Sequence, residues 1–97
     1  MKRYPFSCER HSHDIEFMYN RTRNLMYDLE RSDDPADCKE YNRLQIQAHE
    51  LSDLLSTVLA TRDGRGIAWI SGQDYKLAKE AISWAAEERA TPKSQPA

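Results

Sequence analysis

The sequence lacks a long apolar run and the marks of export. No stretch of its 97 residues approaches the roughly 20 apolar residues of a membrane-spanning helix. The first residues, MKRYPFSCERH, also lack the apolar core of a signal peptide. We therefore expect a soluble, cytoplasmic protein with no membrane segment. Without an export signal, Cys8 and Cys38 are predicted to be reduced thiols rather than a disulfide.

An excess of charge of one sign is missing as well. Charged residues make up 31% of the chain, but the formal net charge is only −2. This balance excludes both a strongly charged disordered chain and a general binder of polyanions. Only 39% of the residues are hydrophobic, so a domain of this length has a thin core. A thin core favours helices that share an apolar face with a second copy or with another protein.

No catalytic motif is present. The Gly-x4-Gly-Lys pattern of a phosphate-binding loop is missing, and RDGRG at 62–66 does not resemble it. A cysteine near histidines needs a converging base and an orienting group before it becomes a nucleophile, and nothing indicates that convergence. The acidic run at 30–40 is typical of solvated residues that cap a helix. We predict a protein that is not an enzyme and needs no cofactor.

Two apolar stripes at helical spacing are the most informative feature that is present. They predict an antiparallel hairpin of two long helices, at 14–31 and 35–61. Asp14 is the expected N-cap of the first helix, and Asp34 followed by Pro35 is the expected start of the second. The stripes consist of Ile15, Met18, Thr22, Leu25 and Leu29, and of Tyr41, Leu44, Ala48, Leu51, Leu55 and Val58.

The rest of the chain predicts one more helix. The spacing of Ser71 and Asp74 indicates a capping box at the start of a helix over 72–89. Before it, 67–70 (IAWI) is expected to be an extended connector that inserts Ile67, Trp69 and Ile70 into the core. Residues 1–13 are expected to form an irregular arm, and 91–97 a disordered tail. The predicted fold is therefore all-α, a single domain over 1–90.

The third predicted helix carries two apolar faces, and two faces need two partners. One face must pack on the hairpin. Either the other completes the core of a single copy, with Trp84 over the connector, or it makes a homodimer together with the end of the second helix. The residues predicted for this dimer interface are Leu77, Ala81, Trp84, Leu54 and Val58.

Charge is distributed unevenly along the chain. The segment 1–23 is rich in basic residues, whereas 28–40, at the turn of the predicted hairpin, is rich in acids. An exposed acidic tip can meet a basic groove of another protein. We therefore predict an inhibitor or adaptor that occludes a surface of a larger cytosolic protein, in the style of phage or mobile-element proteins that counter host defence. The predicted contact residues are Asp33, Asp34, Asp37, Glu40, Arg21 and Arg23.

Two alternatives remain open. The first is a small transcriptional regulator that binds DNA or a transcription factor, although nucleic acid is not the expected partner because the helix at 72–89 has balanced charge. The second is a zinc-binding helical protein that uses Cys8, His11 and His13. The second pair of ligands typical of a structural zinc site is missing, so we predict no metal.

Overall fold

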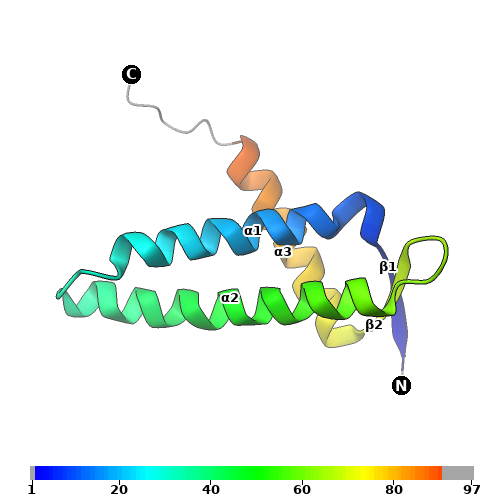
Figure 1. Ribbon diagram of the computed structural model, residues 1–97, viewed down its shortest axis with the longest axis horizontal. Coiled ribbons are helices and arrows are strands. Elements are labelled where there is room, and N and C mark those ends of the chain that lie inside the picture. The colour runs from blue at the N-terminus through cyan, green and yellow to red at the C-terminus, as the bar shows by residue number, and fades with distance from the viewer. Residues whose placement is uncertain (1, 91–97) are drawn as a thin grey trace.

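A computed structural model describes residues 2–90 of the chain. The elements follow in the order β1 (Arg3–Ser7), α1 (Cys8–Leu29), α2 (Pro35–Thr61), β2 (Ile67–Ser71) and α3 (Gly72–Ala90). Helices α1 and α2 lie side by side as a long hairpin, and α3 crosses this hairpin on its far side (Figure 1). The prediction of a largely all-α fold is confirmed. The tail predicted at 91–97 lies outside the described residues.

The predicted starts of α2 and α3 are confirmed. The Asp34 side chain accepts a hydrogen bond from the Ala36 amide at 2.9 Å, and Pro35 opens the helix. Proline fits there because its missing N–H would have no partner in the first turn. At the start of α3, the Ser71 hydroxyl accepts a hydrogen bond from the Asp74 amide at 3.1 Å. Both helices therefore begin where a side chain satisfies an otherwise free amide.

We predict that Asp34→Ala lowers the free energy of unfolding by about 1 kcal/mol, the usual contribution of an N-cap. Urea denaturation measures this change. Asp33→Ala is the matched control, because Asp33 is exposed and makes no hydrogen bond or ion pair within residues 2–90. Equal losses in the two variants would contradict the capping role.

The irregular arm predicted at 1–13 is wrong. Residues 3–7 form β1, which pairs antiparallel with β2, and α1 begins six residues earlier than predicted. Ser7 is the N-cap of α1 and accepts a hydrogen bond from the Arg10 amide, whereas Asp14 lies buried inside the helix. The strand could not be predicted from residues 1–13 alone. A single strand has no partner for its backbone N–H and C=O groups, and the partner of β1 is β2, far away in the sequence.

The connector predicted at 67–70 is extended, but it is a strand. Side chains alternate between the two faces of a strand. Ala68 and Ile70 therefore point into the core and are fully buried, while Trp69 points outward and is 46% exposed. The prediction that Trp69 is a core residue is wrong for this reason.

The core lies where α3 crosses the hairpin. Fully buried side chains from α1, α2 and β2 meet three alanines of α3 at this crossing. Small alanine side chains let the helix approach closely and leave the large aliphatic groups to fill the space. The fully buried residues include Ile15, Leu51, Val58, Ile70, Ala78, Ala81 and Ala85.

Candidate functional site

The hairpin extends beyond α3 (Figure 1). We call residues 22–48, the turn and the adjoining parts of α1 and α2, the tip half. Its small core consists of Met26, Leu44 and Ala48, packed only against other residues of α1 and α2. The tip half is therefore two helices thick and has no third element over either side within the described chain.

The tip half exposes large apolar side chains. Tyr27 on α1 is 73% exposed and Ile46 on α2 is 62% exposed. An open hollow of about 310 Å³ lies beside Tyr27, with Arg23 and Tyr41 in its lining. Tyrosine and arginine are enriched in protein interfaces, because each combines a large contact area with hydrogen-bonding groups. The full lining is Arg23, Asn24, Met26, Tyr27, Glu30 and Tyr41.

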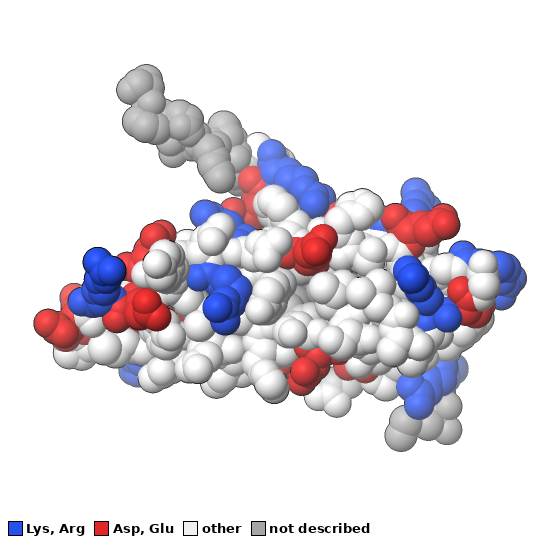
Figure 2. All heavy atoms as spheres, viewed as in Figure 1, with Lys and Arg blue, Asp and Glu red and all other residues white. Residues whose placement is uncertain are grey.

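Three of the four acidic residues predicted to contact a partner have bonds within the chain. Asp34 caps α2, and Asp37 accepts a hydrogen bond from the Ser32 hydroxyl at 2.6 Å. Glu40 accepts two hydrogen bonds from Arg43, which hold the pKa of this carboxyl below its ordinary value. Acidic and basic side chains alternate at this end of the molecule (Figure 2). Partner contact by this group stays a prediction.

The two arginines predicted for the same surface lie in different places. Arg21 forms an ion pair with Glu88 of α3, at 2.9 Å between Nε and Oε1. Arg23 forms no ion pair within residues 2–90 and lines the hollow beside Tyr27. Tyr27 was not among the predicted residues, because it lies off the apolar stripe of α1.

Three of the residues predicted for a dimer interface are buried within the single chain. Leu54, Val58 and Ala81 are at most 1% exposed, so their placement on a surface is wrong. Leu54 and Val58 of α2 and Ala81 of α3 are buried because α3 packs against the hairpin where it crosses it. Leu77 and Trp84 are half-buried and pack against the same core. The homodimer itself stays a prediction.

The three residues considered for zinc have other surroundings. Cys8 is buried, its Sγ lies 3.5 Å from the Val58 carbonyl oxygen, and burial raises the pKa of its thiol. His11 faces Asp14, while His13 is exposed. Within residues 2–90, no three histidine, cysteine or acidic side chains come together as a metal-binding group. Because Cys8 is buried and no such group of ligands converges within residues 2–90, these positions give the zinc alternative no support.

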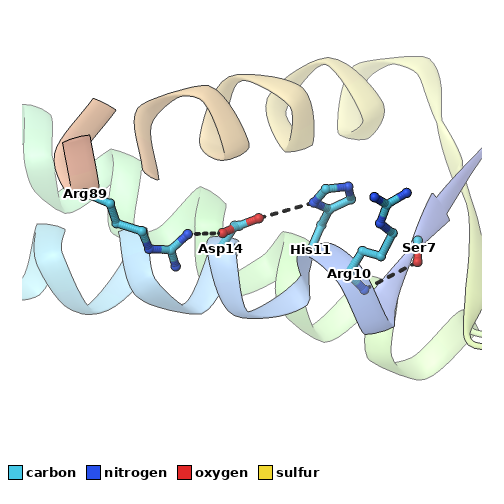
Figure 3. A network of polar contacts seen from close by, with 5 residues as sticks. All are labelled: Ser7, Arg10, His11, Asp14 and Arg89. Atoms are coloured by element: carbon cyan, nitrogen blue, oxygen red, sulfur yellow. Dashed lines mark hydrogen bonds and ion pairs between the residues drawn. The ribbon is translucent and has the colours of Figure 1, made fainter. Parts of the chain in front are cut away.

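A polar network fixes the end of α3 against α1 (Figure 3). The buried carboxylate of Asp14 lies between Arg89 of α3 and His11 of α1. The Arg89 guanidinium also lies over the Phe17 ring, 4.5 Å from its centroid. Together with the Arg21–Glu88 pair, this network links α3 to α1 beside their crossing.

Comparisons with protein-family models, with curated proteins and with solved structures find no match. None of the helices in residues 2–90 combines the length and apolar character needed to cross a membrane.

Proposed function

We propose that this chain is a non-catalytic protein-binding module, an inhibitor or adaptor that uses the tip half of its hairpin to cover a surface of a larger cytosolic protein. One observation carries the proposal. The tip half extends beyond α3 with Tyr27 73% and Ile46 62% exposed, while only three of its residues form a core. Exposed tyrosine and isoleucine side chains supply apolar contact area that a protein partner can cover.

The chemistry around Tyr27 supports the same role. Tyr27 and Tyr41 offer ring faces and hydroxyls, and Arg23 offers a guanidinium with no ion pair within the described residues. Such groups hold an interface partner through apolar contact and directed hydrogen bonds together. The carboxylates of the turn, with Asp33 exposed at its centre, would add attraction to a basic rim on the partner.

The test is capture of a partner from the native host by the tagged chain, read by mass spectrometry and followed by measurement of affinity. We expect the double variant Arg23→Ala and Tyr27→Ala to weaken binding of the captured protein by about a hundredfold, as for two interface hot spots. Asp33→Lys should weaken it by about fivefold, the effect of one exposed charge pair.

Leu59→Ala provides the matched control. Leu59 is 44% exposed on α2 but lies outside the tip half. Its loss should leave the affinity unchanged. A partner that binds the Arg23 and Tyr27 double variant as tightly as the unaltered chain would rule out this surface as the interface.

A further inference from the structure

A second open hollow, of about 350 Å³, lies between β1, the start of α1 and α3, away from the tip half. Volumes of this order accommodate one or two large side chains of a ligand. We call it the β1 hollow. Its lining consists of Pro5, Phe6 and Ser7 of β1, Arg10 and His11 of α1, and Tyr75, Lys79 and Ile82 of α3.

The floor of the β1 hollow is apolar and held in place. Phe6 is only 4% exposed and Ile82 packs against the main core. Tyr75 stacks on Tyr4 with ring centroids 5.0 Å apart, which fixes the position of its ring. A ligand side chain can therefore bind an existing apolar surface, without the cost of ordering one first.

The lining carries basic groups and no acidic one. Arg10 forms no ion pair within residues 2–90, and the Lys79 ammonium lies 5.6 Å from the Tyr75 ring centroid. The nearby Asp14 does not neutralise them, because its two oxygens face His11 and Arg89 (Figure 3). The charge that complements this lining is a carboxylate on the ligand.

The exposed edge of β1 disfavours binding by strand addition. The Cys8 amide donates a hydrogen bond to the Gly66 carbonyl oxygen. Hydrogen-bonded and non-hydrogen-bonded pairs alternate along an antiparallel ladder, so Tyr4 and Phe6 form the hydrogen-bonded pairs of β1 with β2. Pro5 lies in a non-bonded pair, where a backbone N–H would point away from β2, and proline has none. A ligand here is therefore held through its side chains rather than as a further strand.

We propose that the β1 hollow binds a peptide segment of a protein partner in which a carboxylate adjoins a large apolar side chain. The apolar side chain lies on Phe6 and Ile82, and the carboxylate accepts hydrogen bonds from Arg10 and Lys79. This inference rests on the proposed role as a protein-binding module and adds a second contact, distinct from the tip half.

The probe is the peptide acetyl-Glu-Phe-amide, titrated into the full chain and followed by amide chemical shifts. We expect the shifts to centre on Phe6, Arg10 and Ile82, with a Kd of the order of 1 mM, as befits a small ligand. The Glu-to-Gln and the Phe-to-Ala versions of the peptide should each bind about fivefold more weakly, since each loses one of the two contacts.

Variants of the chain test the two cations. Arg10→Ala and Lys79→Ala should each lower the affinity for the peptide by about fivefold. Both side chains are exposed, so the fold is retained. Arg31→Ala removes an exposed arginine at the hairpin turn and should leave the affinity for the peptide unchanged.

Four outcomes would overturn the inference: no shifts at the lining residues, equal binding of the Gln peptide, full binding by Arg10→Ala, or tighter binding of free 3-phenylpropanoate than of the peptide. The last result would assign the hollow to small carboxylates. The proposed function is tested separately, because the peptide experiment leaves Arg23 and Tyr27 intact and the capture experiment leaves the β1 hollow intact.

Discussion

Leu51→Ala is expected to lower the free energy of unfolding by about 3 kcal/mol, the largest effect of any change considered for this chain. Leu51 is fully buried where α1, α2 and α3 meet. Removing its side chain loses the apolar transfer energy and leaves a cavity, because α3 is already in close contact through alanines and cannot move further in. A domain of this size has about 5 to 10 kcal/mol of total stability, so this loss is severe.

Urea denaturation measures the change, with Leu59→Ala as the control on the same helix. Leu59 is 44% exposed, so its truncation should cost at most about 0.5 kcal/mol. If the two leucine variants lost similar stability, Leu51 would not lie in a closely packed core beneath α3.

The hairpin could be predicted from the sequence, because its signals are local. Asp34 and Pro35 fix the start of α2 by themselves, and the observed helix spans the predicted range, Pro35–Thr61. The β ribbon could not be predicted in this way. Its strands are separated in the sequence by both helices of the hairpin, and each is too short to be recognised without the other. The misplaced start of α1 has the same cause, because Ser7 caps the helix from the end of β1.

The surface of the tip half was predicted only in part. Arg23 was selected for its charge, and it does line the hollow beside Tyr27. Tyr27 was not predicted, because it lies off the apolar stripe of α1, and the hollow beside it forms only where Tyr41 of α2 lies next to α1. The sequence predicted two separate apolar faces on α3, one for the hairpin and one for a partner. However, the hairpin is two helices wide, so Leu77 and Trp84 also find contacts on the core of the same chain.

Asp14 connects the two elements whose crossing sets the exposed surface. Burial alone would raise the pKa of its carboxyl, but hydrogen bonds from Arg89 and His11 outweigh burial and hold the pKa below its ordinary value. The folded state thus favours the charged form. Its stabilising effect is complete above the pKa of the unfolded chain, near 4, and is lost as the pH falls through the lower pKa of the folded state.

We predict that Asp14→Asn lowers the free energy of unfolding by about 2 kcal/mol at pH 7, since the buried Asp14 side chain loses its charge-assisted hydrogen bond to Arg89 and its hydrogen bond to His11. The difference from the unaltered chain should shrink as the pH falls from 5 towards 2, about the range over which the carboxyl takes up its proton. Urea denaturation at several pH values measures both the loss and its pH dependence.

Asp53→Asn is the matched control for this titration. Asp53 also pairs with a histidine on its own helix, His49, but its side chain is 71% exposed. Water already solvates this carboxylate, so its change should cost at most about 0.5 kcal/mol and leave the pH dependence unaltered. An Asp14→Asn variant with the pH dependence of the unaltered chain would show that Asp14 does not hold α3 through its charge, and that the alanine packing alone sets the crossing.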